Sequence, residues 1–145
     1  MTDPTSTHLS LGLEGELRDE GRPVRLAMLG CGSHTYRNVL PVLRWIPSAR
    51  LEACCDLNLE KARAYARSFG ARSAFADYRA MLDETELDGV LVVLGFDADG
   101  RPRYPGIVAD LLARGLPVWL EKPPAATELE VVEMVRAAVP PAISS

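Results

Sequence analysis

Two glycines follow an apolar run in the stretch VRLAMLGCGSHT, which begins at residue 24. The run 24–29 has the composition of a buried strand, and Gly30 and Gly32 stand where the chain must turn into its next element. In a strand–turn–helix unit the first glycine permits the tight turn, and the second lets the backbone approach a pyrophosphate. Thr35 replaces the third glycine of the G-x-G-x-x-G motif and adds a branched side chain where crowding is expected.

Two glycines alone fit a phosphate-binding turn and a plain structural turn equally well. Two further residues of the turn are candidates for cofactor contact, namely Ser33 and His34. His34 either touches the pyrophosphate or the substrate, or is an ordinary histidine of a loop that faces solvent.

The acidic residue Asp56 ends the second apolar segment, 50–56. In a βαβ nucleotide-binding unit an acid at this position accepts hydrogen bonds from the hydroxyls of the adenosine ribose. Its alternative role is to cap the helix expected near Asn58, and one carboxylate can serve both purposes. A carboxylate here repels a 2′-phosphate, so the sequence favours NAD, with NADP less favoured; Lys61 and Arg63 keep that preference moderate.

A lysine follows the last apolar segment, in the stretch EKPPA at residues 121–125. Ligands of open α/β sheets bind outside the carboxyl ends of the strands, so the residues after the fourth and fifth segments must lie beside the cofactor. Lys122 would project towards the nicotinamide, where a cation can bind a substrate oxygen or assist a proton transfer. Taken without context, the same residues describe a surface ion pair. The residues expected at these strand ends are Leu94, Gly95, Glu121, Lys122 and Pro123.

Short apolar segments alternate with segments of helical spacing along the chain. The expected strands are 24–29, 50–56, 89–94 and 117–121, with a weaker strand at 72–75. Apolar stripes at helical spacing lie in 62–69 and 107–112, a short helix is expected at 78–82, and the T-x-x-E capping box at Thr127 marks the start of another. Such alternation predicts an α/β fold, a doubly wound parallel sheet with strand order 3-2-1-4-5.

The composition narrows the class of protein. A net charge of −4 and a pI of about 5.2 give no electrostatic footprint for nucleic acid or for an anionic membrane. The longest uncharged apolar stretch, 89–96, is far shorter than the ~20 residues that cross a bilayer, and no secretory signal is visible. Three cysteines, two of them adjacent, indicate reduced thiols in a cytoplasmic protein and predict no metal site. We expect 1–22 to be a flexible arm, 23–139 a dinucleotide-binding domain and 140–145 a tail.

The order of these motifs resembles the cofactor domain of the Gfo/Idh/MocA family (glucose–fructose oxidoreductase and inositol dehydrogenase). The resemblance covers Val24 to Ala138, and E-K-P after the last strand is its most specific element. It implies a Rossmann fold that binds NAD(P), followed in the family by an α+β substrate domain. It also implies hydride transfer with a sugar, a polyol or a related carbonyl compound. By resemblance, Gly30, Gly32 and Asp56 contact the cofactor, and Lys122 acts as the catalytic residue on the nicotinamide side, with Glu121 supporting it.

Three features depart from the family. Thr35 stands where Gly or Ala is usual, and the loop after the fourth strand has Gly95-Phe96-Asp97 in place of a Thr-Pro-like turn. The family's α+β substrate domain, which supplies a histidine for proton transfer, has no match in the 145 residues. We therefore expect the cofactor-binding part of an oxidoreductase, truncated or dependent on a partner chain or on self-association, and without turnover alone. The alternative is a stand-alone nucleotide-binding or scaffolding module without catalysis.

Overall fold

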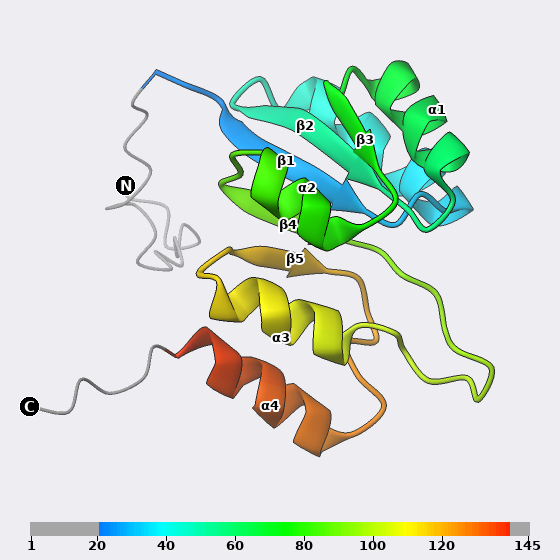
Figure 1. The fold of residues 1–145 in the computed structure, drawn as a ribbon, viewed down its shortest axis with the longest axis vertical. Coiled ribbons are helices and arrows are strands. Elements are labelled where there is room, and N and C mark those ends of the chain that lie inside the picture. The colour runs from blue at the N-terminus through cyan, green and yellow to red at the C-terminus, as the bar shows by residue number, and fades with distance from the viewer. Residues whose placement is uncertain (1–20, 140–145) are drawn as a thin grey trace, which may run out of the picture.

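Five parallel strands form the centre of residues 21–139, the part of the chain that the computed structural model describes (Figure 1). The order across the sheet is β3-β2-β1-β4-β5, as the sequence predicts. The expected tail 140–145 and all of the expected arm except residues 21 and 22 lie outside the described residues. The strands are β1 (Val24–Leu29), β2 (Ala49–Cys55), β3 (Ser73–Phe75), β4 (Gly89–Val92) and β5 (Val118–Leu120).

The strand bounds agree with the sequence prediction to within two residues. The prediction for 89–94 was too long, because pairing with β5 ends at Val92, whose carbonyl accepts a hydrogen bond from Glu121 N at 3.1 Å. The predictions 50–56 and 117–121 were likewise wrong by one residue at their ends. β1 lies in the middle of the sheet and pairs in parallel with β2 and β4, so the strand that carries the glycine turn is supported from both sides.

Each face of the sheet packs against its own hydrophobic cluster. The first cluster contains Leu29 of β1 and covers the face over which α2, α3 and α4 lie (Figure 1). The second contains Met28 and covers the opposite face, beneath α1 and the segment 35–45. Neighbouring residues of β1 thus point to opposite faces and are buried on both, as expected for a central parallel strand. The α-helices are α1 (Leu59–Phe69), α2 (Tyr78–Glu84), α3 (Pro105–Ala113) and α4 (Glu128–Ala138).

Side-chain caps fix where the helices begin. Asn58 caps α1 by accepting hydrogen bonds from Glu60 N and Lys61 N. The cap of this helix, considered above as an alternative role of Asp56, is therefore Asn58. The capping box predicted at Thr127 is present, with Glu130 closing it, so α4 begins where its sequence indicates.

The segment after the glycine turn is not a regular α-helix. It consists of a π-helical turn, η2 (Thr35–Val39), followed by a 3₁₀ segment, η3 (Leu40–Trp45). A regular helix would need the N–H of residue 41 to donate to the carbonyl of residue 37, and Pro41 has no N–H to donate. Instead, Leu40 N donates a hydrogen bond to Thr35 O, five residues earlier. This hydrogen bond defines the π turn, which begins next to the glycine turn.

An acidic residue ties the amino-terminal edge of the sheet together, opposite the glycine turn. Asp88 accepts a hydrogen bond from Arg25 N at 2.8 Å and pairs with the Arg25 guanidinium at 3.1 Å. Arg22 pairs with the same carboxylate at 2.9 Å. These two guanidinium groups and the backbone N–H hold the pKa of Asp88 well below its usual range.

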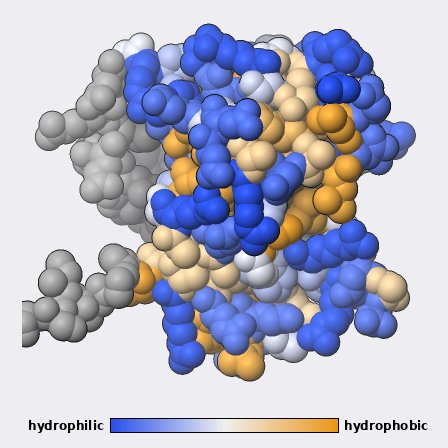
Figure 2. Space-filling model, viewed as in Figure 1, coloured by the Kyte–Doolittle hydropathy of each residue, from blue (hydrophilic) through white to orange (hydrophobic). Residues whose placement is uncertain are grey.

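The outer surface mixes polar and apolar side chains. Figure 2 shows the face over α2, α3 and α4, where hydrophilic side chains predominate and hydrophobic ones lie between them. Leu129 and Val135 of α4 are exposed. Within residues 21–139, none of the helices has the length and apolar character needed to cross a membrane.

Candidate functional site

The glycine turn begins at the carboxyl end of β1. Gly30 has φ +102°, and a Cβ atom there would lie 1.9 Å from the carbonyl oxygen of Val93, so no other residue fits this approach of backbone to backbone. A Cβ at Gly32 would meet no atom within 4 Å. The first glycine is therefore required by the fold, whereas the second leaves open space over the backbone, as a bound phosphate needs.

Three side chains from different elements hold the polar groups of the turn. The Thr35 hydroxyl donates to Gly30 O at 2.8 Å, and Asp56 Oδ2 accepts from Cys31 N at 2.9 Å. The Tyr65 hydroxyl of α1 donates to Gly32 O at 2.8 Å. Thr35 is the branched residue for which crowding was expected. Its side chain is fully buried and forms this hydrogen bond within the turn.

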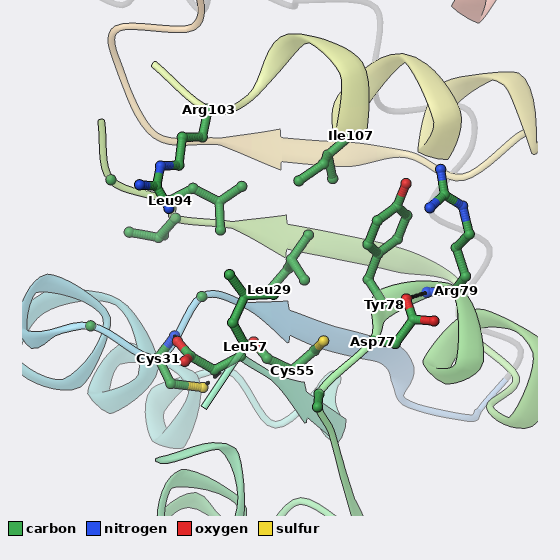
Figure 3. Close-up of a pocket in the computed structure, with 16 residues that line it drawn as sticks. Leu29, Cys31, Cys55, Leu57, Asp77, Tyr78, Arg79, Leu94, Arg103 and Ile107 are labelled. Carbon is green, nitrogen blue, oxygen red and sulfur yellow. Dashed lines mark hydrogen bonds between the residues drawn. The ribbon is translucent and has the colours of Figure 1, made fainter. Parts of the chain in front are cut away.

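A cleft of about 540 Å³ opens at the carboxyl ends of the strands, above the glycine turn (Figure 3). Asp56 lies at the end of β2 on this cleft, and its second oxygen accepts a hydrogen bond from Asn58 N at 2.9 Å. Figure 3 shows Leu94 and Arg103 on the side of β4 and α3, and Cys31 and Leu57 on the side of β1 and β2. The predicted residues that line the cleft are Gly30, Gly32, Asp56, Leu94 and Gly95.

The other predicted residues form a second group beside the turn. His34 Nε2 lies 2.9 Å from Glu121 Oε2, and Lys122 Nζ lies 3.0 Å from Glu121 Oε1. The hydrogen bonds from the Lys122 side chain and backbone, and then the one from His34, lower the pKa of Glu121 to about 2. This group joins the glycine turn to the end of β5 through side chains.

The group is open to solvent on one side. The Lys122 side chain is 89% exposed, so its ammonium is available to a ligand as well as to Glu121. Ser33 is exposed next to His34, and Pro123 is exposed after Lys122. None of these residues lines the cleft itself.

Several residues of the site have no signal in the sequence. Tyr65 belongs to the apolar stripe expected in 62–69, and only the fold brings its hydroxyl to the glycine turn. The aromatic ring of Tyr65 packs edge-on against Tyr36 at a centroid distance of 5.5 Å, which fixes its direction. The further residues that line the cleft, beyond those predicted, include Asp77, Tyr78, Arg79 and Ile107. Arg103 also lines it, from the loop after β4 that the sequence places beside the cofactor.

Cys31 in the glycine turn is free and buried, and so are Cys54 and Cys55 at the end of β2. A hydrogen bond with Cys54, followed by burial, raises the pKa of the Cys31 thiol far above its usual range, and burial raises that of Cys55 to about 12. Among the described residues, no three potential metal ligands of the His, Cys, Asp or Glu type are grouped together.

Comparison with known proteins gives the same fold. The sequence profile of the Gfo/Idh/MocA group, described as an oxidoreductase family with an NAD-binding Rossmann fold, matches residues 24–140. The chain is 33% identical over 111 residues to D-apiose dehydrogenase of Paraburkholderia graminis, covering 77% of this chain and 28% of that protein. It is 26% identical over 115 residues to inositol 2-dehydrogenase of Burkholderia multivorans, covering 79% and 33%.

A solved structure agrees. The WlbA dehydrogenase of Chromobacterium violaceum, in complex with NADH and UDP-GlcNAcA, superposes with a TM-score of 0.70 at 28% identity. The match covers 81% of this chain and 32% of that one, and the chain spans about a third of the length of these relatives. The parallel sheet, the glycine turn and the profile match together assign residues 24–140 to the Gfo/Idh/MocA oxidoreductase family, as its NAD-binding Rossmann domain.

Proposed function

We propose that this chain is the NAD-binding part of an oxidoreductase that moves a hydride between the cofactor and a sugar, a polyol or a related carbonyl compound. The observation that carries the proposal is the arrangement of Gly32 and Asp56 on one cleft at the carboxyl edge of the sheet. Gly32 leaves the backbone open to a phosphate, and Asp56 sits at the end of the neighbouring strand.

The residues present fit a dinucleotide in chemistry and in position. The backbone around Gly32 and Ser33 would face the pyrophosphate, and the Asp56 carboxylate would accept hydrogen bonds from the adenosine ribose. Asp56 already accepts from Cys31 N and Asn58 N, but a carboxylate offers about four acceptor positions, so two remain for the ribose. A carboxylate at this place disfavours a 2′-phosphate, which supports NAD over NADP.

Lys122 is proposed to act at the nicotinamide end. When bound, the cofactor accepts or donates the hydride; the exposed Nζ of Lys122 would bind the substrate oxygen and stabilise the charge that develops there. Glu121 holds Nζ at 3.0 Å and so restricts where the ammonium can lie. His34 holds the other oxygen of Glu121 and thereby positions Glu121 from the glycine turn.

The remainder of the site is proposed to come from outside this domain. The relatives extend to about three times the matched length, and turnover in this proposal needs a substrate-binding part, supplied by further chain, by a partner chain or by a second copy. The expectation that residues 24–140 alone do not turn over substrate stays a prediction.

Calorimetric titration with NAD⁺ and NADP⁺ tests the cofactor assignment. Wild type is expected to bind NAD⁺ more tightly than NADP⁺. Asp56→Ala should weaken NAD⁺ binding by about 1–3 kcal/mol, because hydrogen bonds to a charged group are lost, and should narrow the difference between the two cofactors. A smaller difference between the NAD⁺ and NADP⁺ affinities indicates a lost contact with the ribose. A general disturbance of the turn would instead weaken the binding of both cofactors equally.

Asp99→Ala is the matched control. Asp99 is an exposed acid of the loop after β4 that does not line the cleft, so its removal changes the net charge equally and should leave both affinities unchanged. Absence of dinucleotide binding by wild type, or unchanged NAD⁺ affinity in Asp56→Ala, would contradict the assignment.

A further inference from the structure

One cation that lines the cleft has no hydrogen-bond or ion-pair partner among residues 21–139. Four charged side chains line the cleft, namely Asp56, Asp77, Arg79 and Arg103. Figure 3 shows Arg103 on the side of β4 and α3, with its side chain directed towards Leu94 and away from Tyr78 and Arg79. It therefore stands across the cleft from Cys31 of the glycine turn.

The other three charges have partners within the fold. Asp56 accepts from two backbone N–H groups, and Asp77 Oδ1 caps α2 by accepting from Arg79 N at 3.0 Å. Arg79 Nε lies 3.5 Å from Asp110 Oδ2, and its guanidinium carbon lies 4.9 Å from the ring centroid of Tyr78. The Arg103 guanidinium, by contrast, makes no hydrogen bond or ion pair with any of residues 21–139.

The backbone on both sides of Arg103 is fixed. Arg103 N donates to Gly95 O at 3.3 Å, and the next residue, Tyr104, is 2% exposed. The Tyr104 hydroxyl accepts a hydrogen bond from Leu94 N at 3.2 Å, which closes the loop against the end of β4. The Arg103 side chain is thus attached to a backbone that is already fixed, so less conformational entropy is lost when its guanidinium binds a ligand.

We propose that Arg103 binds a phosphate oxyanion of the dinucleotide, that of the pyrophosphate, from the wall of the cleft opposite the glycine turn. The inference rests on the proposed function. Backbone N–H groups at Gly32 and Ser33 supply hydrogen bonds but no full charge, and two carboxylates line the same cleft. A guanidinium opposite the turn would supply the counter-charge that these N–H groups lack, and its planar shape matches phosphate oxygens with paired N–H donors.

The test compares ligands that differ in their phosphates. NAD⁺, NADP⁺, ADP-ribose and adenosine are titrated into wild type and Arg103→Ala, with calorimetry for the dinucleotides and ADP-ribose and NMR shifts for adenosine. We expect Arg103→Ala to bind NAD⁺ and ADP-ribose about tenfold more weakly, the low end for a charged hydrogen bond because the guanidinium is exposed. Adenosine, which has no phosphate, should bind both proteins equally.

Two further variants keep the result interpretable. Arg103→Gln retains most of the side-chain length and should lose as much affinity as Arg103→Ala. Arg101→Ala removes the same charge two residues away, from a side chain that pairs with Glu130 at 3.4 Å and does not line the cleft, so its affinities should equal those of wild type.

Each other outcome overturns the proposal in a distinct way. Unchanged NAD⁺ affinity in Arg103→Ala leaves the proposed function standing and assigns Arg103 elsewhere, such as to an anionic substrate. A loss confined to NADP⁺ places it at the 2′-phosphate, and an equal loss for adenosine places it on the base. An equal loss of NAD⁺ affinity in Arg101→Ala would show that the effect comes from the net charge and not from a contact of Arg103. If wild type binds no dinucleotide, the inference fails together with the proposed function.

Discussion

Replacement of Thr35 by the glycine of the motif should destabilise this protein. Thr35 is 0% exposed and donates to the carbonyl of Gly30, which is itself buried. The loss of that bond leaves a buried acceptor without this partner, at a cost of about 1–3 kcal/mol. The lost burial of the methyl group and the backbone freedom of glycine each add about 1 kcal/mol. We expect Thr35→Gly to lower the free energy of unfolding by about 3–5 kcal/mol.

Urea denaturation followed by circular dichroism measures this loss, with the slope of the transition checked for constancy. Thr35→Val keeps the side-chain shape and removes the hydroxyl, so it should lose about 1–3 kcal/mol. Thr35→Ser keeps the hydroxyl and should lose only about 1 kcal/mol, for the methyl group. A Thr35→Gly protein as stable as wild type would refute the reasoning, and so would a Thr35→Val protein as stable as wild type.

Two further predictions concern the carboxylates at opposite edges of the sheet. Asp88→Ala should lower the free energy of unfolding by about 1–2 kcal/mol, since it removes the bonds to Arg25 and Arg22. It should leave the affinity for the cofactor unchanged, because Asp88 lies at the edge of the sheet opposite the glycine turn. Denaturation measures the first effect and calorimetry the second, and weakened cofactor binding would contradict the separation of the two edges. Glu121 should titrate near pH 2 in carboxyl NMR, compared with about 4.3 for a free glutamate, so its ion pair with Lys122 persists until the pH approaches 2. The stability that this pair contributes is complete above about pH 4.3 and declines as the pH falls from there to about 2. Lys122→Gln should move this midpoint upward, whereas a wild-type midpoint near the ordinary value would show that the pairs do not form.

The sheet could be predicted from sequence because its strands are buried on both faces. In 24–29 five of the six side chains are apolar, and that pattern fits a central strand of a parallel sheet better than an amphipathic helix. Once the strands alternate with helices, the order 3-2-1-4-5 brings the ends of β1, β2 and β4 to one edge. The placement of Gly30, Asp56 and Leu94 on one cleft follows from that topology.

The contacts that hold the site depend on tertiary structure, and local sequence does not encode them. Tyr65 lies 33 residues from Gly32, and its apolar spacing predicts only that the ring is buried. Arg103 belongs to a loop without periodicity, whose path is set by bonds to Gly95 and Leu94 after folding. The irregular helix after the turn had a signal, Pro41, but the choice of a π turn over a simple break depends on how the segment packs.

The reactivity of the three cysteines can report how often the glycine turn opens. Cys31, in the glycine turn, and its neighbour Cys54 are 0% exposed, and Cys55 is 2% exposed. With their sulfur atoms enclosed and the pKa values of Cys31 and Cys55 raised, reaction with a thiol reagent must wait for a fluctuation that uncovers them. The labelling rate of Cys31 therefore measures how often the turn opens. A ligand that binds the closed turn slows that rate in proportion to its occupancy, so binding can be measured without turnover.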